Sequence, residues 1–282
     1  MISGTFKGYL HLARPVNVVI TLVAIPVACW LAGAGAADSW KIILAAITGA
    51  LVTVGANAIN DYFDIEIDRI NKPERPLPSG VLSPREAWYV WLICSLFSIL
   101  LNIVLNVEAF AIVFLAVVLL YFYSSRFKGT ILFGNLIVGL MTGMAFIYGG
   151  IVVGTVNRSI TPALFAFLTN VSREIVKDME DIKGDAARQA QTLPVRLGLY
   201  PARCLVGFLI LLLIVTTIIV SQLHIYTSLF IICLIPVDIA FMVTGVAVWF
   251  SSSSEAMHRL SVLLKICMAV GMIAIILGSL PW

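Results

Sequence analysis

Long apolar stretches recur along almost the whole of this 282-residue chain, and short segments between them carry most of the charged residues. A stretch of about 17 to 25 apolar residues has the length of an α-helix that crosses a hydrocarbon core of about 30 Å. Inside that core every backbone polar group must be bonded within the protein, so a spanning segment of this length is helical. We therefore predict an all-α, polytopic membrane protein.

Composition supports this class, because 61% of the residues are hydrophobic and 12% are charged, and the mean hydropathy is +1.04. We expect about nine transmembrane helices in one integral membrane domain, residues 1–282. The fourth span is short because Glu108 and Tyr121 limit its apolar run. The expected spans are residues 15–34, 41–63, 86–105, 109–124, 132–153, 160–181, 202–221, 226–249 and 259–280.

Lysine and arginine residues are distributed unevenly among the predicted loops. Fifteen of the 18 fall on one side of the expected topology, whereas Lys41 and Arg158 fall on the other and Lys265 lies within the last span. Positively charged loops remain in the cytoplasm. We therefore expect a multi-pass protein of the cell membrane, with the amino terminus and the active site cytoplasmic and the carboxy terminus external.

The remaining bulk properties exclude other classes. A net charge of +3 is too small to suggest a nucleic-acid partner. The five cysteines are scattered singly among apolar neighbours without metal-ligand spacing, which is typical of packed thiols. The first apolar run is longer than a signal peptide and lacks a convincing cleavage site, so we expect it to stay in the protein.

Two groups of oxygen-bearing side chains lie at the ends of predicted spans with the same i, i+4, i+7, i+11 spacing. The groups are Asn57, Asp61, Asp64 and Asp68, and Glu174, Asp178, Asp181 and Asp185. On a continuous α-helix these offsets fall within about 60° of one another, so each group points its oxygen atoms in one direction. Carboxylates held this closely repel one another unless a cation lies between them. Mg²⁺ prefers oxygen ligands and phosphate groups, so we predict Mg²⁺ as cofactor and a diphosphate as substrate.

The aspartates of the two groups define a first aspartate motif (Asp61, Asp64 and Asp68) and a second aspartate motif (Asp178, Asp181 and Asp185), and we predict that all six are catalytic metal ligands. Adding 117 to each residue number of the first motif gives the second motif. The same offset relates Pro84 to Pro201, each in the first turn of the span after its loop. We expect two pseudo-repeated halves, roughly 15–124 and 132–249, followed by a final span at 259–280.

Three sequence motifs are Asn60-Asp61-x-x-Asp64-x-x-x-Asp68, Arg75-Pro76-Leu77-Pro78-Ser79-Gly80 and Asp178-x-x-Asp181-x-x-x-Asp185. With these motifs the chain resembles the UbiA superfamily of intramembrane prenyltransferases over nearly its whole length. The resemblance implies a helical bundle around a central, lipid-accessible cavity. It also implies an enzyme, a transferase of prenyl groups, that moves an isoprenoid chain from its diphosphate to an acceptor, with Mg²⁺ between the diphosphate and the aspartates.

Within that family, the residues around both motifs are similar to those of the archaeal digeranylgeranylglyceryl phosphate synthases. This resemblance implies transfer of a geranylgeranyl chain from geranylgeranyl diphosphate to geranylgeranylglyceryl phosphate in archaeal ether-lipid biosynthesis. The expected partners are an isoprenoid diphosphate, a lipid-like phosphate acceptor and membrane lipids, without an obligate protein partner. Three alternatives are considered. The first is prenylation of an aromatic acceptor, such as 4-hydroxybenzoate or another quinone or chlorophyll-type precursor. The second is a divalent-cation transporter, since repeated halves with intramembrane carboxylates also occur there, and the third is a non-catalytic lipid-binding or scaffold protein that retains the fold.

Further side chains are expected to bind the substrates. Arg75 offers the bidentate fork that phosphate geometry favours, and Arg14 with Asn17 matches the family's early Arg-Pro-x-Asn pattern. The expected substrate-binding residues are Arg14, Asn17, Asn57, Asn60, Lys72, Arg75, Tyr123, Lys128 and Lys177. Candidates for the acceptor's phosphate are Arg126, Lys177, Arg188 and Arg196.

Three other features have two interpretations each. Tyr121, Tyr123 and Tyr148 either stabilise an allylic cation through their ring faces or pack the bundle. Asp238 in the eighth span either contacts substrate or pairs with Lys265 or with a backbone amide freed near Pro236. Small residues of the fifth span either let helices approach closely or leave room for a lipid tail; they are Gly134, Gly139, Gly143, Gly149 and Gly150.

Overall fold

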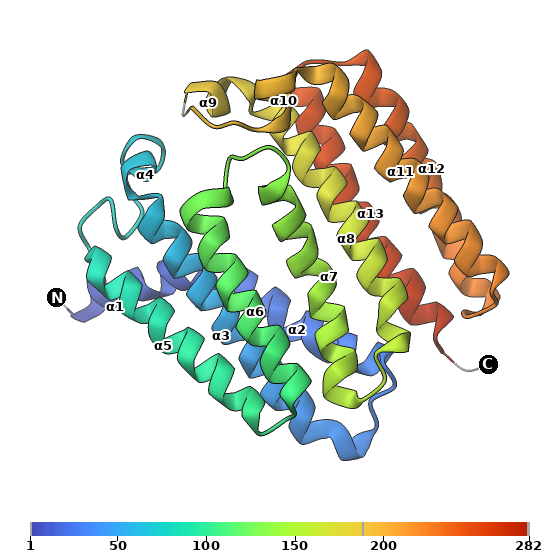
Figure 1. Cartoon of the computed structure of the whole chain (residues 1–282), viewed down its shortest axis with the longest axis horizontal. Coiled ribbons are helices and arrows are strands. Elements are labelled where there is room, and N and C mark those ends of the chain that lie inside the picture. Colours follow the sequence, from blue (N-terminus) through green and yellow to red (C-terminus); the bar gives the residue numbers. More distant parts are fainter. Residues whose placement is uncertain (1, 188, 281–282) are drawn as a thin grey trace. The chain divides into compact units, whose positions relative to one another are not determined.

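The computed structural model describes residues 2–187 and 189–280. Within these two ranges every regular element is helical, which confirms the predicted all-α class. The chain forms two compact units (Figure 1). Unit 1 comprises Met1–Phe127 and Ala145–Ser159, and unit 2 comprises Lys128–Met144 and Ile160–Trp282.

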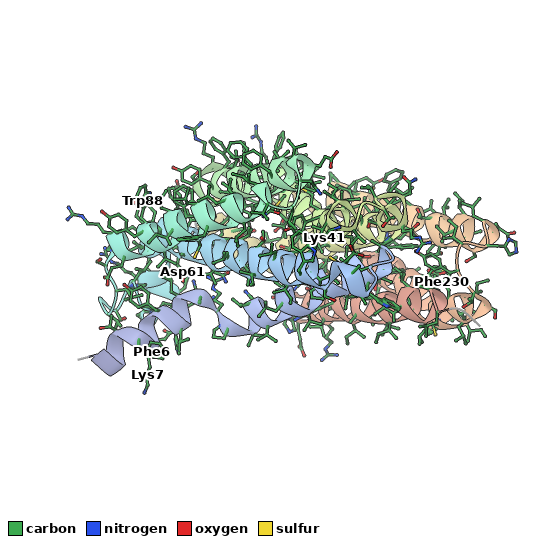
Figure 2. The ribbon with its side chains drawn as sticks, turned by 90° about the horizontal axis from the view of Figure 1, so that it is seen from below. Phe6, Lys7, Lys41, Asp61, Trp88 and Phe230 are labelled. Carbon is green, nitrogen blue, oxygen red and sulfur yellow. The ribbon has the colours of Figure 1, made fainter. Side chains whose placement is uncertain are left out.

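Unit 1 is built around the long helix α3. This helix packs against α1, α2, α5 and α6, and α5 and α6 run beside it in Figure 1. Figure 2 shows Lys41 and Asp61 toward opposite ends of α3. The elements are α1 Ile2–Ala13, α2 Pro15–Leu31, η1 Ala36–Asp38, α3 Ser39–Phe63, α4 Ile65–Asn71, α5 Pro84–Ile103, α6 Val107–Phe122 and the π-helical turn η2 Tyr123–Phe127.

Two helices pass from one unit to the other, α7 Phe133–Val153 and α8 Asn157–Glu180. In unit 2, α12 packs between α11 and α13, and α10 contacts α9 and α11. Large side chains such as Phe230, Leu213 and Met257 are fully buried there. The remaining elements are α9 Ile182–Ala187, α10 Leu193–Leu197, α11 Leu199–Gln222, α12 Ser228–Phe250 and α13 Ser254–Gly278.

The protein is a multi-pass membrane protein, but the expected number of spans was slightly high. In the part of the chain that the structure describes, seven helices are long and apolar enough to cross a membrane, and the bent pair Gly4–Ala13 and Pro15–Leu31 raises the number to at most eight. The expected span 160–181 corresponds to α8, which is long enough but is not among these helices. Its last two turns carry five charged residues, so its hydropathy is lower than its length suggests.

The first helix pair bends by 46° at Arg14. Arg14 has a left-handed backbone conformation with φ 52°, which is uncommon for a residue other than glycine. Pro15 follows at the first position of α2, where its fixed φ and missing N–H favour a helix start. The bend therefore places the Arg14 side chain at the corner between α1 and α2.

Glycines allow α7 to pack closely against its neighbours. A β-carbon at Gly143 would lie 2.9 Å from the carbonyl oxygen of Ala163 in α8, and one at Gly139 would lie 3.2 Å from the carbonyl oxygen of Phe167. In unit 1, a β-carbon at Gly149 would lie 2.7 Å from the backbone of Ala28. At these positions the small residues serve close packing rather than space for a tail.

Tyrosine and aspartate side chains within the spans have structural partners. The Tyr148 hydroxyl donates to Asn102 Oδ1 at 2.8 Å in the core of unit 1, so this residue packs the bundle. Thr217 Oγ1 in α11 donates to Asp238 Oδ2 in α12 at 2.9 Å. Asp238 thus bonds to Thr217, and the expected pairing with Lys265 is not found among the described residues.

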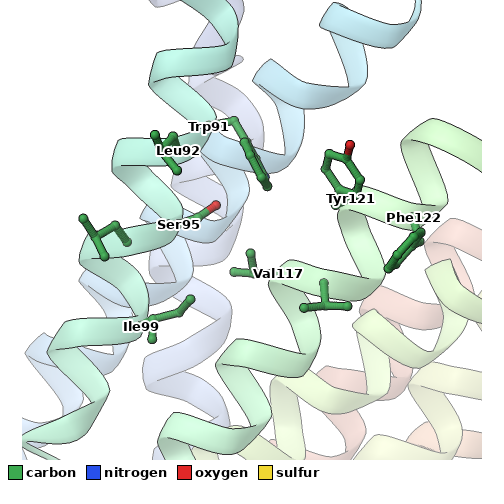
Figure 3. A pocket seen from close by; sticks show the side chains of 9 residues that line it. Trp91, Leu92, Ser95, Ile99, Val117, Tyr121 and Phe122 are labelled. Atoms are coloured by element: carbon green, nitrogen blue, oxygen red, sulfur yellow. The ribbon is translucent and has the colours of Figure 1, made fainter.

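An apolar groove of about 320 Å³ lies between α5 and α6 (Figure 3). Tyr121 lines it beside Trp91, with ring centroids 5.2 Å apart. The Tyr121 ring also contacts Phe63 edge to face, with ring centroids 5.6 Å apart. None of the residues that line the groove is charged, and Ser95 and Tyr121 are the lining residues with hydroxyl groups. The groove therefore lacks the charged groups needed to bind a phosphate.

Candidate functional site

The helix that carries the first aspartate motif is interrupted in the middle of the motif. Helix α3 ends at Phe63 and α4 begins at Ile65, while Asp64 between them has φ −90° and ψ 1°. Asn57 and Asp61 therefore lie on α3, Asp68 lies on α4, and Asp64 lies between the two helices. The hydrogen bonds nevertheless continue, from Asp64 N to Asn60 O at 3.0 Å and from Asp68 N to Asp64 O at 2.8 Å. All three aspartates stay buried, with exposed fractions of 4%, 7% and 5%.

The second aspartate motif repeats this local structure. Helix α8 ends at Glu180, Asp181 lies outside the helix, and α9 begins at Ile182. The corresponding bonds run from Asp181 N to Lys177 O at 3.1 Å and from Asp185 N to Asp181 O at 2.8 Å. The offset of 117 thus applies to the helix ends, to the interruption and to both hydrogen bonds. Asp185 is buried, whereas Asp181 is exposed.

Two arginines contact the carboxylates of the first motif. Arg14, at the bend before α2, forms an ion pair with Asp61. Arg75, in the loop between α4 and α5, places Nη1 2.6 Å from Asp68 Oδ2 and 3.3 Å from Asp61 Oδ1. The carboxylate side chains are only 5% and 8% exposed, so water screens these pairs weakly. Folding of unit 1 therefore brings together two expected phosphate ligands and two expected metal ligands.

Asparagines of α3 hold neighbouring groups in place. Asn60 Nδ2 donates to Asp64 Oδ2 at 3.0 Å, which orients that carboxylate. Asn57 is buried, and its Nδ2 donates to the carbonyl oxygen of Ala13 at 2.9 Å. The amide of Asn57 thus fastens α3 to the end of α1, beside Arg14. Asn17 is exposed in the first turn of α2.

The other expected substrate ligands lie on loops and helix ends. Lys72 is exposed directly after α4, Tyr123 is the first residue of η2, and Lys128 is exposed at the start of unit 2. Lys177 forms an ion pair with Glu174 at 2.9 Å. Among the acceptor-phosphate candidates, Arg126 and Arg196 are exposed, and Arg188 lies outside the described residues.

Two buried donors to the second motif were not expected from the sequence. Asn135 Nδ2, in the first turn of α7, donates to Asp178 Oδ2 at 2.8 Å. Thr192 Oγ1 donates to Asp185 Oδ2 at 3.1 Å. The internal repeat contains a signal for one of them, because Thr192 lies 117 residues after Arg75, and each contacts the third aspartate of its motif.

The donor set of the first motif fits a divalent cation. Arg75 Nη1 lies within 3.3 Å of carboxylate oxygens from both Asp61 and Asp68, so these oxygens converge on one position that a positive charge already occupies. Carboxylate oxygens are the ligands that hard divalent cations prefer. Among residues 2–187 and 189–280, no three side chains of the His, Cys, Asp and Glu types are arranged as a complete cation site. A cation at either motif would therefore require side-chain movement or ligands from its substrate.

Comparison with known proteins agrees with the motifs. The chain is 35% identical to the digeranylgeranylglyceryl phosphate synthase of Thermococcus kodakarensis, over 98% of this chain and 99% of that protein. It is 34% identical to the synthase of the same name from Methanosphaera stadtmanae, over 96% of this chain and 99% of that protein.

Solved structures of related proteins are also similar to this chain. A structure from work on digeranylgeranylglyceryl phosphate synthase in membranes aligns with a TM-score of 0.89 at 31% identity, over 98% of each chain. A UbiA homologue from Archaeoglobus fulgidus, bound to DMAPP and Mg²⁺, shares the fold with a TM-score of 0.65 at 19% identity, over 95% of this chain and 98% of that one. Residues 18–274 match the model of the UbiA prenyltransferase family. The chain therefore belongs to the UbiA prenyltransferase family.

Proposed function

We propose that this enzyme transfers a geranylgeranyl chain from geranylgeranyl diphosphate to geranylgeranylglyceryl phosphate, forming digeranylgeranylglyceryl phosphate in archaeal ether-lipid biosynthesis. The observation that carries this proposal is the full-length similarity to synthases of that name. The arrangement of unit 1 supports it, because Arg75 lies between two carboxylates of one motif. A site that combines carboxylates with a guanidinium fork suits a diphosphate accompanied by a metal.

Cleavage of the allylic carbon–oxygen bond leaves negative charge on the diphosphate and positive charge on the chain. In this proposal the aspartates of each motif are ligands for divalent cations, and when bound, Mg²⁺ would supply Lewis-acid stabilisation of the leaving group. Arg75 and Arg14 bind the diphosphate oxygens through their guanidinium groups. Asn60 donates a hydrogen bond to the Asp64 carboxylate and so orients it.

The acceptor reacts through its free glycerol hydroxyl, whose oxygen forms the new ether bond while its proton leaves. An aspartate carboxylate of the motifs that is not occupied by the cation accepts that proton. Because a glycerol hydroxyl is a very weak acid, the proton leaves late, as the oxygen attacks the carbocation-like carbon. Exposed arginines of the loops, including Arg126 and Arg196, are the candidates to bind the acceptor's phosphate.

Product formation by the purified protein in detergent tests this function. Geranylgeranyl diphosphate is offered with geranylgeranylglyceryl phosphate or with 4-hydroxybenzoate, in Mg²⁺ or in EDTA, and the product is identified by mass spectrometry. We expect a Mg²⁺-dependent diether phosphate. Exclusive prenylation of 4-hydroxybenzoate would instead assign the protein to aromatic prenylation, and divalent-cation flux into liposomes without any prenyl product would indicate a transporter.

Substitution of the central aspartate of each motif tests the role of the motifs. We expect Asp64→Ala or Asp181→Ala to abolish turnover while leaving a folded membrane protein, because each removes a ligand from a cluster that works as one unit. Asp38→Ala is the matched control, since Asp38 pairs with Lys41 at 3.0 Å near the other end of α3. Near-normal turnover in either motif variant, with unchanged Mg²⁺ dependence, would exclude the proposed metal site.

A further inference from the structure

The second aspartate motif receives hydrogen bonds from two uncharged side chains. Asn135 donates to Asp178, and Thr192 donates to Asp185. The donors are buried, with exposed fractions of 7% and 4%. Neither donor lies in an aspartate motif or in the loop motif Arg75–Gly80.

Close packing of α7 on α8 brings Asn135 to Asp178. Asn135, Gly139 and Thr142 follow one another at helical spacing on one face of α7. Gly139 lies against the backbone of α8, and Asn170 Nδ2 in α8 donates to Thr142 Oγ1 at 2.5 Å. The interface between α7 and α8 thus consists of polar and small residues and ends at the second aspartate motif. Asn135 is the last hydrogen-bond donor of this interface before the Asp178 carboxylate.

Thr192 reaches the motif from the loop after α9. It is the residue before α10, where a threonine side chain commonly accepts a bond from the helix. Here the side chain makes no capping bond, and its hydroxyl donates to Asp185 Oδ2 at 3.1 Å. The hydroxyl is therefore used for the motif rather than for the helix.

We propose that Asn135 and Thr192 are positioning residues that fix the Asp178 and Asp185 carboxylates for binding of a divalent cation. This inference rests on the proposed function. Each donor engages one carboxylate oxygen, Oδ2, so that the other oxygen keeps a defined direction. Carboxylates that bind metals are generally oriented by such hydrogen bonds, and loss of the partner costs about 10–100-fold in metal affinity or activity.

The carboxylates of the first motif have charged partners instead. Its outer aspartates are held by the charged donors Arg14 and Arg75, and Thr192 occupies the position equivalent to Arg75. A guanidinium competes with a metal for the carboxylate charge, whereas an amide or a hydroxyl orients the carboxylate without neutralising it. Asn135 and Thr192 therefore act by orientation, and their removal should weaken metal binding rather than strengthen it.

Binding of Mn²⁺ alone to the full-length protein in detergent, measured from the free-ion electron paramagnetic resonance signal, tests the proposal without any prenyl substrate. We expect Asn135→Ala and Thr192→Val each to raise the Kd for Mn²⁺ by about 10–100-fold. Thr192→Ser keeps the hydroxyl and should restore the wild-type Kd. In Asp178→Asn, adding Asn135→Ala should have no further effect, because Asn135 acts through Asp178.

Matched controls come from the same helix interface. Asn170→Ala and Thr142→Val each remove a polar contact between α7 and α8 that lies outside the motif. They should therefore lower thermal stability but leave the Kd for Mn²⁺ within about twofold of wild type. The proposal would be overturned by any of three results. These are an unchanged Kd for Mn²⁺ in both Asn135→Ala and Thr192→Val, a loss of Mn²⁺ affinity in the controls equal to that in these variants, or no Mn²⁺ binding by the wild type. If Asn135→Ala does not fold, Thr192→Val still tests the proposal, because valine keeps the shape of the threonine side chain.

Failure of the proposed function would look different. A wild-type protein that binds Mn²⁺ with these variant effects but forms no diether phosphate would keep Asn135 and Thr192 as positioning residues and reject the acceptor. A protein that forms the diether phosphate while all the variants bind Mn²⁺ equally would keep the function and reject the positioning role.

Discussion

Arg75 is the residue on which the first aspartate motif converges, because its guanidinium contacts both Asp61 and Asp68. We expect Arg75→Gln to lower the free energy of unfolding by about 1–3 kcal/mol without divalent cations, since hydrogen bonds to charged groups contribute about this much. The loss should be smaller in Mg²⁺, because a bound cation compensates the same carboxylates. Thermal unfolding measured with and without Mg²⁺ checks this.

The control for Arg75 is Arg69→Gln, because Arg69 pairs with Glu66 at 2.9 Å but both side chains are exposed, at 60% and 80%. Exposed ion pairs contribute about 0–1 kcal/mol. Equal destabilisation by the two substitutions, or a loss at Arg75 that Mg²⁺ does not reduce, would contradict the idea that Arg75 stands where a cation binds.

Gly184 gives a second test at the residue scale. A β-carbon at this position would meet the Asp181 carboxylate, so Gly184→Ala should displace that carboxylate without changing any charge. We expect turnover to fall by at least about tenfold, as displaced catalytic groups generally cause. Gly271→Ala is the matched control, since no neighbouring atom lies within 4 Å of its β-carbon position. Steady-state rates at saturating substrate compare the two, and equal rates would show that Asp181 has room to move.

At the scale of single elements, α5 is fixed by its first turn. Ser83 Oγ accepts from Glu86 N at 3.3 Å, and Glu86 Oε2 accepts from Ser83 N at 2.7 Å. We expect Ser83→Ala to cost about 1 kcal/mol and to lower the Tm by about 2 °C, whereas Ser83→Thr keeps the cap and should be close to neutral. Calorimetry on the detergent-solubilised protein measures both. Equal Tm values for the two variants would mean that packing alone holds the helix start.

At the scale of the whole molecule, the membrane orientation can be tested through the parity of its crossings. The distribution of Lys and Arg leads us to propose a cytoplasmic amino terminus and an external carboxy terminus. The seven spanning helices by themselves put the two termini on opposite sides of the membrane. Two further elements, the bent helix pair at Arg14 and helix α8, must therefore both cross the membrane or both stay on one side of it. Labelling of single cysteines at each terminus in intact cells checks it. Both termini on one side would reject the proposed orientation and show that only one of these two elements crosses.

Several features were predictable from the sequence because they depend on neighbouring residues or on composition. Hydropathy over about 20 residues predicts a membrane helix, so the all-α class followed without knowledge of any contact. Ser83 and Glu86 are three residues apart, and their mutual bonds in the structure confirm the expected cap. The repeated aspartates, in register with the spans, were enough to indicate the family.

Tertiary structure decided the features that depend on groups far apart in the chain. Arg14 and Asp61 are 47 positions apart, and Asn135 and Asp178 are 43 apart, so no periodicity could pair them. The interruptions at Asp64 and Asp181 also could not be read from spacing, because an i, i+4, i+7, i+11 pattern survives one non-helical residue when the hydrogen bonds continue across it. The sequence by itself determined what the chemical groups are and which helices carry them, because local propensity and burial in lipid act over short stretches. Packing decided which donor meets which carboxylate, because hydrogen bonds and ion pairs need distances that only the folded chain sets.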